Sequence, residues 1–150
     1  NRFKREYSYE YVELSNELVD ECKGIARGWC KERECGCTRG EYCERYANNL
    51  VLDNFDRLDC EGALIKVNGR FEGFTIGEML NSDTAVIHIE KANSSVNGLY
   101  TFLNQQFCEN RWKGVEYINR EQDLGVSGLR KAKSSYHPVK MLKKYTIAIR

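Results

Sequence analysis

The amino-acid sequence predicts an α/β domain in which helices flank a mixed central sheet. Runs that alternate apolar and polar residues and runs with helical spacing of apolar residues follow one another in the order β-α-α-β-β-β-α-β-α-β. Two of the strands, within residues 84–119, are separated by a helix, and such a connection is typical of parallel pairing. Interleaved strands and helices predict a layered α/β domain.

Composition fits one domain spanning residues 1–150. The chain is 41% hydrophobic and 30% charged, with a net charge of +1. This charge gives no support to a nucleic-acid or acidic-membrane partner. The longest apolar runs are too short to cross a bilayer, so no transmembrane segment is predicted. Seven cysteines read as reduced thiols, which predicts a cytoplasmic protein.

The first elements are a strand and two helices. Tyrosines alternate in "YSYEYVEL", residues 7–14, which predicts a strand. Apolar residues recur with helical period over residues 16–33, which predicts a helix. The T-x-x-E capping box at residues 38–41 opens a second helix that ends near Asp56.

The middle of the chain predicts three strands. "GALIKV", residues 62–67, is joined by Asn68-Gly69 to residues 70–79, which together predict a hairpin. Gly73 and Gly77 indicate a bulge or a close backbone approach in the second strand. Residues 84–90 form the third strand, and their apolar run predicts burial on both faces.

The last elements are predicted as two helices, each followed by a strand. The first helix covers residues 96–112, with Leu99, Leu103 and Phe107 on one face. The strand "GVEYIN" and a short basic helix at residues 125–134 follow. "VKMLKKYTIAI", residues 139–149, closes the predicted sheet.

The cysteines at residues 30, 35, 37 and 43 have the spacing C-x4-C-x-C-x5-C. A zinc site usually offers two C-x2-4-C pairs, so the spacing fits zinc poorly. We expect neither a metal nor a disulfide in this segment.

Two stretches carry a family resemblance. They are "GFTIGEMLNSDTAVIHIEKAN" and "EYINREQDLGVSGLRKAKSSYHPVKML", together with the helix between them. They resemble a bacterial family that is itself similar to the C-terminal domain of phosphatidylglycerol lysyltransferases. The resemblance implies a GNAT-like acyltransferase fold, which agrees with the element order. It covers residues 62–147 best.

The resemblance also implies partners and substrates. It implies that the chain is the C-terminal half of a tandem protein whose N-terminal half is also GNAT-like. It implies acyl or aminoacyl transfer to an amine or a lipid head group, with aminoacyl-tRNA as a donor. Exposed apolar surface on the isolated fragment would favour a homodimer.

The segment "EKANSSVNG" follows the third predicted strand of the middle group. GNAT enzymes carry Q/R-x-x-G-x-G/A there, and its backbone N–H groups bind the CoA pyrophosphate. That glycine pattern is missing, which argues against acetyl-CoA as donor. Two interpretations stay open: Asn93, Ser94 and Ser95 cap the following helix, or they bind an anionic substrate group together with Lys91.

A dense polar cluster, "NREQD", ends the strand that stops at Asn119. Ligands of open α/β sheets tend to bind at the carboxyl ends of strands. Arg120 can grip a carboxylate or phosphate, Asn119 can donate and accept hydrogen bonds, and Glu121 can act as a catalytic base. The alternative is a structural network in which Asp123 caps the next helix.

The basic run "LRKAKSSYHP" gives the remaining candidates. Arg130, Lys131 and Lys133 form either a solvated helix face or a contact to tRNA or phosphate. His137 is a candidate general acid or base beside the substrate-binding candidate Tyr136. His88, within a buried strand, is interpreted as a core or sheet histidine.

The sequence therefore favours an enzyme, an acyl- or aminoacyltransferase. Glu121 and His137 are its catalytic candidates, and no cofactor is assigned. Two alternatives stay open. One is a degenerate GNAT domain that binds a ligand or RNA without catalysis. The other is a structural half that supports an N-terminal GNAT domain.

Overall fold

The computed structural model describes residues 2–33 and 44–148. The chain divides into two compact units, Asn1–Asn119 and Arg120–Arg150. The first unit contains a sheet of five strands in the order β1-β2-β3-β4-β5. The strands are Tyr9–Glu13, Glu61–Val67, Arg70–Met79, Thr84–Ala92 and Tyr117–Asn119. All neighbours pair antiparallel except β4 and β5, which are parallel.

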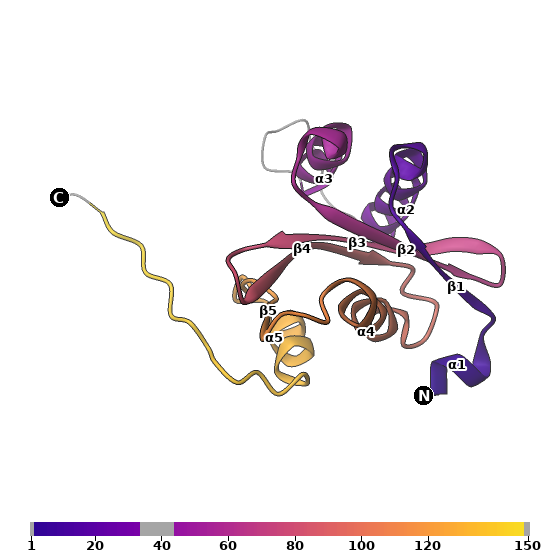
Figure 1. Cartoon of the computed structure of the whole chain (residues 1–150). Coiled ribbons are helices and arrows are strands. Elements are labelled where there is room, and N and C mark those ends of the chain that lie inside the picture. The colour runs from indigo at the N-terminus through magenta and orange to yellow at the C-terminus, as the bar shows by residue number, and fades with distance from the viewer. Residues whose placement is uncertain (1, 34–43, 149–150) are drawn as a thin grey trace. The chain divides into compact units, whose positions relative to one another are not determined.

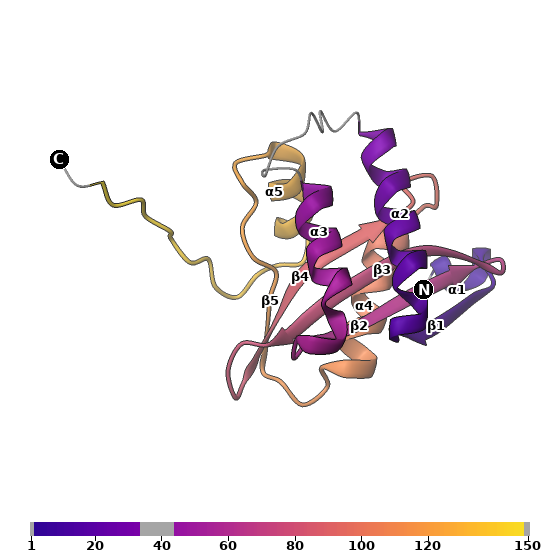
Figure 2. The ribbon, with the colours of Figure 1, turned by 90° about the horizontal axis from the view of Figure 1, so that it is seen from above.

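Helices cover both faces of this sheet. On one face lie α2 (Val19–Glu32), which follows the 3-10 turn η1 (Asn16–Leu18), and α3 (Glu44–Asp53) (Figure 1). On the other face lies α4 (Leu99–Arg111). Seen from above, α2 and α3 lie side by side across the strands (Figure 2). The predicted mixed sheet between helix layers is confirmed.

Two apolar layers form the core of this unit. Phe74 and Ile76 of β3 pack with Leu52 and Ala26 under α2 and α3. On the α4 face, the predicted stripe of Leu99, Leu103 and Phe107 is buried, with at most 1% of each side chain exposed. The helix α1 (Arg2–Glu6) was not predicted; its Phe3 stacks on Phe102 with ring centres 4.2 Å apart.

The predicted hairpin and its glycines are confirmed. Asn68 and Gly69 have φ values of 50° and 84°, as a two-residue turn with two left-handed residues requires. Pairing shifts register between Ile65 and Lys66 and again between Ile76 and Gly77. A Cβ on Gly77 would lie 2.5 Å from the carbonyl oxygen of Val86, so the backbones meet too closely for any other residue.

The second unit contains one helix, α5 (Ser127–Ser134), which was predicted at residues 125–134. The predicted closing strand at 139–149 is wrong for the described residues, because residues 137–148 carry no strand. A strand needs a neighbour for its backbone groups, and the described part of this unit offers none. The capping box at residues 38–41 and the cysteines at 35, 37 and 43 lie outside the described residues.

Candidate functional site

The end of β4 carries a buried cation. Only 7% of the Lys91 side chain is exposed, and its ammonium lies 2.5 Å from a carboxylate oxygen of Glu44 on α3. The same nitrogen sits 3.7 Å from the ring centre of Trp29 on α2. An opposite charge and an aromatic face compensate the cost of burying an ammonium group. Lys91 therefore joins β4 to both helices on this face.

The loop after β4 is held by carboxylates from elsewhere in the chain. The amide nitrogen of Asn93 donates to Glu72 Oε2 at 2.8 Å, and Ser94 Oγ donates to Glu32 Oε2 at 2.8 Å. Ser95 N donates to Asn93 Oδ1 at 2.9 Å. Two carboxylates on these side chains make the loop electrostatically unfavourable for an anion.

The capping interpretation of Asn93, Ser94 and Ser95 is wrong. Helix α4 begins at Leu99 with Gly98 as N-cap, and no side chain caps it. Gly98 has a φ of 79°, in the left-handed region that glycine adopts without strain. The three polar residues stop short of the helix because their side chains organise the preceding loop instead.

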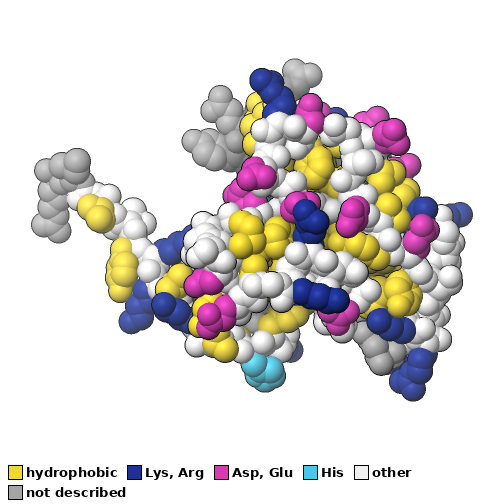
Figure 3. Space-filling view, in the orientation of Figure 1, with side chains coloured by type: hydrophobic (Ala, Val, Ile, Leu, Met, Phe, Trp, Pro, Cys, Tyr) yellow, Lys and Arg dark blue, Asp and Glu magenta, His cyan; other side chains and the backbone are white. Residues whose placement is uncertain are grey.

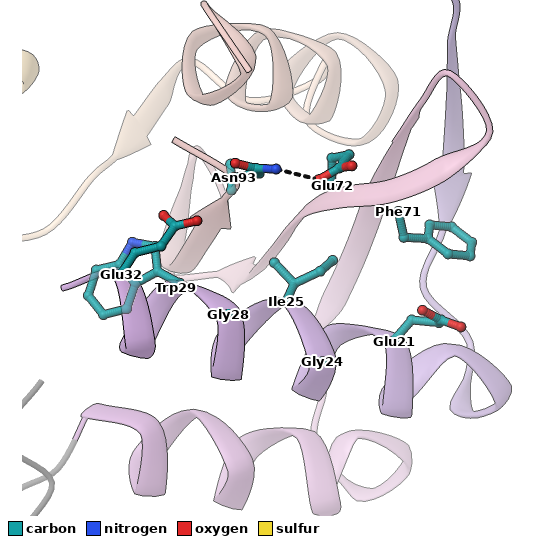
Figure 4. A pocket seen from close by; sticks show the side chains of 10 residues that line it. Glu21, Gly24, Ile25, Gly28, Trp29, Glu32, Phe71, Glu72 and Asn93 are labelled. Carbon is teal, nitrogen blue, oxygen red and sulfur yellow. Dashed lines mark hydrogen bonds between the residues drawn. The ribbon is translucent and has the colours of Figure 1, made fainter. Parts of the chain in front are cut away.

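A trough of about 270 Å³ lies beside this loop, between α2 and the adjoining ends of β3 and β4 (Figure 4). Three of its lining residues are carboxylates, and the others are apolar, small or, in one case, an amide. Its walls are formed by Glu21, Gly24, Ile25, Gly28, Trp29, Glu32, Phe71, Glu72, Ala92 and Asn93. Of the sequence-derived candidates, only Asn93 lines it.

A polar group that the sequence analysis missed lies on the α4 face of the sheet. Cβ atoms on Gly73 and Gly77 would meet Leu103 and Phe107 of α4, so Thr75 between them faces the same helix. Thr75 is fully buried, and its hydroxyl has no hydrogen-bond partner among the described residues. Glu90 of β4 lies opposite Thr75 in register and is half-buried. The acidic residue Glu90 at the end of the apolar run "TAVIHIE" is the sequence feature that could have indicated this polar group.

The predicted parallel pairing of the strands around Ile87 and Tyr117 is confirmed. Pairing joins Thr84 to Tyr117 and ends with Val86 opposite Asn119. Beyond this pair, β4 continues to Ala92 with no further β5 partner in the described chain. Asn119 is thus the last residue of the strand and is half-buried.

His88 is a sheet residue but not a core residue. It sits in β4 where the register with β3 shifts, and it is exposed although its strand neighbours are buried. Its Nε2 lies 2.9 Å from Glu78 Oε1. The register shift is the physical reason, because it turns one residue of a two-sided buried strand outwards.

In the second unit, the loop that follows Asn119 is tied to α5. The Asp123 carboxylate accepts from Arg130 Nε at 2.6 Å and from the backbone N–H of Gly125 at 2.9 Å. These bonds lower the pKa of Asp123 to about 2, with the Arg130 bond as the main cause. Lys133 donates to the backbone carbonyl oxygens of Arg120 and Gln122.

These bonds decide whether Asp123 caps α5 and what the basic residues of α5 contact. Asp123 does not cap α5, whose N-cap is Val126; it binds Arg130 one turn into the helix. Arg130 and Lys133 hold the loop, so two of the three predicted basic residues contribute to local structure. Lys131 is exposed.

The loop and the end of α5 bring two substrate-binding candidates together. The Arg120 guanidinium lies over the Tyr136 ring, 4.2 Å from its centre. Glu121 and His137 follow these two residues, and both are exposed with positive φ values of 54° and 52°. The candidates thus fall into two groups along the chain, Lys91–Ser95 with Asn119 in the first unit and Arg120–His137 in the second.

Two further features concern metals and membranes. Within residues 2–33 and 44–148, no three His, Cys, Asp or Glu side chains gather closely enough to hold a metal ion. In the same residues, no helix is both long and apolar enough to span a bilayer. Acidic and basic side chains are interspersed over the face shown in Figure 3.

Solved structures share this fold. A conserved protein of unknown function from Bacteroides thetaiotaomicron is 40% identical, with a TM-score of 0.87 over 94% of this chain and 48% of its own. This chain therefore spans about half the length of that protein. A ribosomal-protein-alanine N-acetyltransferase from Brucella melitensis is 12% identical, with a TM-score of 0.66 over 95% of this chain and 100% of its own. A possible acetyltransferase from Clostridium difficile has the same identity and TM-score, with coverage of 95% and 98%.

Family membership follows from the sequence match. No curated protein matches the chain. The family described as "Phosphatidylglycerol lysyltransferase, C-terminal" matches residues 1–148, nearly the whole chain. The chain therefore belongs to the phosphatidylglycerol lysyltransferase C-terminal family, with the fold of the GNAT acetyltransferases.

Proposed function

We propose that this chain is an acyl-transfer domain that moves an aminoacyl group from an ester donor to an amine or a lipid head group. Family membership over residues 1–148 is the observation that carries the proposal. The parallel pair β4 and β5 in the first unit supports it as part of the fold shared with the GNAT acetyltransferases.

The loop after β4 favours an aminoacyl ester over acetyl-CoA as donor. Its sequence lacks the glycine pattern that exposes backbone N–H groups to a pyrophosphate. Its Asn93 and Ser94 side chains already bind the carboxylates of Glu72 and Glu32. A pyrophosphate placed there would meet two like charges.

The proposed step is nucleophilic substitution at the ester carbonyl. The acceptor nitrogen or oxygen forms a bond to the carbonyl carbon, the ester C–O bond breaks, and the alcohol of the donor leaves. A base takes the proton of the acceptor, and the leaving alkoxide gains a proton. Glu121 is the proposed base and His137 the proposed acid, because both side chains are exposed and close in sequence to the Arg120–Tyr136 pair.

Arg120, Tyr136 and Asn119 are proposed to bind the substrate. Arg120 offers a planar fork of donors, and stacking on Tyr136 restricts its orientation. The proposal includes a longer protein, in which a second GNAT-like half precedes this one. The 48% coverage of the Bacteroides protein supports a length of about twice this chain.

The test uses the complete natural protein and compares two donors. Aminoacyl-tRNA or acetyl-CoA is supplied with vesicles that contain phosphatidylglycerol or with a soluble primary amine, and products are identified by mass spectrometry. We expect product from aminoacyl-tRNA. Acetyl transfer from acetyl-CoA at a comparable rate would overturn the donor assignment.

Variants test the residues. Glu121→Gln should lower the rate by about 100-fold or more, the range that general bases contribute. Glu17→Gln is the matched control, because Glu17 is an exposed glutamate at the start of η1. Full activity of Glu121→Gln would exclude Glu121 as the base.

Absence of transfer from either donor would favour a binding domain without catalysis. The observation that favours this second candidate is again the loop after β4, because carboxylates occupy its polar side chains. Retained binding of aminoacyl-tRNA or lipid without turnover would identify such a domain. Loss of stability in the N-terminal half on deletion of this chain would instead identify a structural role.

A further inference from the structure

The trough beside α2 has a defined face on that helix. Glu21, Ile25, Gly28 and Glu32 all line it. At 3.6 residues per turn, Glu21 and Glu32 lie within about 20° of each other around the helix, and about 16 Å apart along it. The trough therefore runs along α2, with a carboxylate near each end, as Figure 4 shows.

Apolar side chains also line the trough. Ile25 lies between its two ends, Trp29 lies beside Glu32, and Phe71 lies towards the Glu21 end (Figure 4). Gly24 and Gly28 lie within α2, where glycine costs roughly 1 kcal/mol relative to alanine. A Cβ on Gly28 would meet nothing within 4 Å, so close packing does not require this glycine. Its effect is to leave space along the trough.

The third carboxylate comes from the opposite wall. Glu72 of β3 is fixed by Asn93 at 2.8 Å, and Glu32 is fixed by Ser94 at 2.8 Å. These are hydrogen bonds from neutral donors, so they orient the two carboxylates without neutralising them. Within residues 2–33 and 44–148, no ion pair to Glu21, Glu32 or Glu72 is formed.

The chain itself holds an alkylammonium group next to this trough. Lys91 places its ammonium over the Trp29 ring and against the carboxylate of Glu44. Trp29 also lines the trough. A carboxylate and an indole face are therefore the groups that this part of the fold uses to bind an ammonium.

We propose that the trough binds a linear aliphatic polyamine. Its ammonium groups pair with Glu21, Glu72 and Glu32, and its methylene chain lies over Ile25 and Phe71. An elongated trough that carries carboxylates and apolar side chains along its length matches a chain that alternates charge and hydrocarbon. This binding requires no acyl transfer, so it goes beyond the proposed function and does not depend on it.

Two exposed arginines lie near the trough and make its surroundings less negative. The Arg33 guanidinium carbon lies 5.2 Å from the Trp29 ring centre, and Arg27 reaches to 3.8 Å from a Cβ position on Gly24. Both would repel a polyamine and attract an anion. They therefore give the experiment a variant whose effect has opposite signs for the two ligand classes.

The test is isothermal titration of the chain with spermine, spermidine, putrescine and butylamine at low salt. We expect affinity to rise with the number of ammonium groups and to fall with added salt. Glu21→Gln, Glu32→Gln and Glu72→Gln should each weaken spermidine binding about two- to fivefold, the range of exposed ion pairs. Arg33→Gln should strengthen it.

The controls separate binding from folding. Asp20→Asn removes a carboxylate from the same helix, and the Asp20 side chain is 96% exposed outside the trough. It should leave spermidine affinity unchanged. Gly28→Leu should fill the trough and reduce affinity at least about tenfold, with the thermal midpoint of each variant measured alongside.

Three results would overturn the proposal. One is butylamine binding as tightly as spermidine, which would indicate a site for a single ammonium. Another is a triple glutamine variant that binds spermidine as well as the unaltered chain. The third is a dissociation constant above about 10 mM for every polyamine, weaker than about −3 kcal/mol.

Discussion

Residues 2–119 and residues 120–148 differ in what holds them together. In the first region, two buried apolar layers enclose a five-stranded sheet. In the second, none of residues 120–148 is buried, and its contacts include the Asp123–Arg130 ion pair, the Lys133 bonds and the stacking of Arg120 on Tyr136. Packing fixes the first region, whereas exposed polar contacts order the second.

This difference bears on function. Both catalytic candidates, Glu121 and His137, lie in the region without a core, and the buried Lys91 lies in the region with one. Side chains on exposed polar segments reorient at low cost, while buried ones do not. Side chains of the first region are therefore expected to be more rigid than those of the second.

The largest expected effect tests the rigid frame. Gly77→Ala should destabilise the chain by about 3 kcal/mol, because its Cβ would lie 2.5 Å from the carbonyl oxygen of Val86 and backbone atoms cannot move aside cheaply. Urea unfolding followed by circular dichroism measures the loss.

Gly128→Ala is the matched change in the second region. A Cβ there meets nothing within 4 Å, and the residue is helical. Its effect should be neutral or stabilising by up to about 1 kcal/mol. Equal unfolding free energies for the two alanine variants would contradict the contrast between the regions.

A smaller effect is expected at the buried cation. Lys91→Met keeps the aliphatic length but removes the ion pair with Glu44 and the contact with Trp29. We expect a loss of about 1 to 2 kcal/mol in the free energy of unfolding. Glu44→Gln removes only the ion pair, and because Glu44 is 57% exposed its cost should stay below about 1 kcal/mol. A Glu44 variant as unstable as Lys91→Met would show that the indole contact contributes nothing.

The stacking of Arg120 should contribute less again. Tyr136→Ala should reduce the local order of the segment by about 0.5 to 1 kcal/mol, whereas Tyr136→Phe retains the ring and should have little effect. Hydrogen exchange of the α5 amides measures this change locally. Global unfolding would not detect it, because the second region has no buried core. Identical exchange in the two variants would mean that the aromatic face is not the contact that matters.

The fold was predictable where pattern and burial agree. The apolar stripe of α4, the Asn68-Gly69 hairpin and the two-sided burial of β4 all follow from local sequence, because each depends on residues a few positions apart. The strand predicted at 139–149 failed for the opposite reason. Its apolar residues are compatible with a strand, but a strand forms only against a neighbour, and sequence does not supply the neighbour.

The candidate site was less predictable than the fold. The trough joins α2 to β3 and β4, so its carboxylates are up to 51 positions apart, from Glu21 to Glu72, and no local spacing reveals them. Asn93 and Ser94 were identified as polar loop residues, but their partners Glu72 and Glu32 were not. Short-range patterns thus locate single polar residues, while the charge of a site depends on tertiary partners.

The smallest expected effect is a pH dependence confined to the second region. Asp123 has its pKa lowered from 3.8 to about 2, mainly by Arg130 and then by the Gly125 N–H. A lowered pKa in the folded state means that the ionised carboxylate contributes stability. That contribution is fully present above the unfolded value near pH 3.8, and it is lost as the pH falls through about 2.

Carbon NMR titration of the Asp123 carboxyl should give a midpoint near 2. Arg130→Gln should return it towards 3.8, while Lys131→Gln, which removes an exposed charge from the same helix, should change it little. The resonances of the buried core should not follow this titration, since the carboxylate orders only the loop before α5. A midpoint that stays low in Arg130→Gln would assign the shift to the backbone N–H groups of the loop instead of the ion pair.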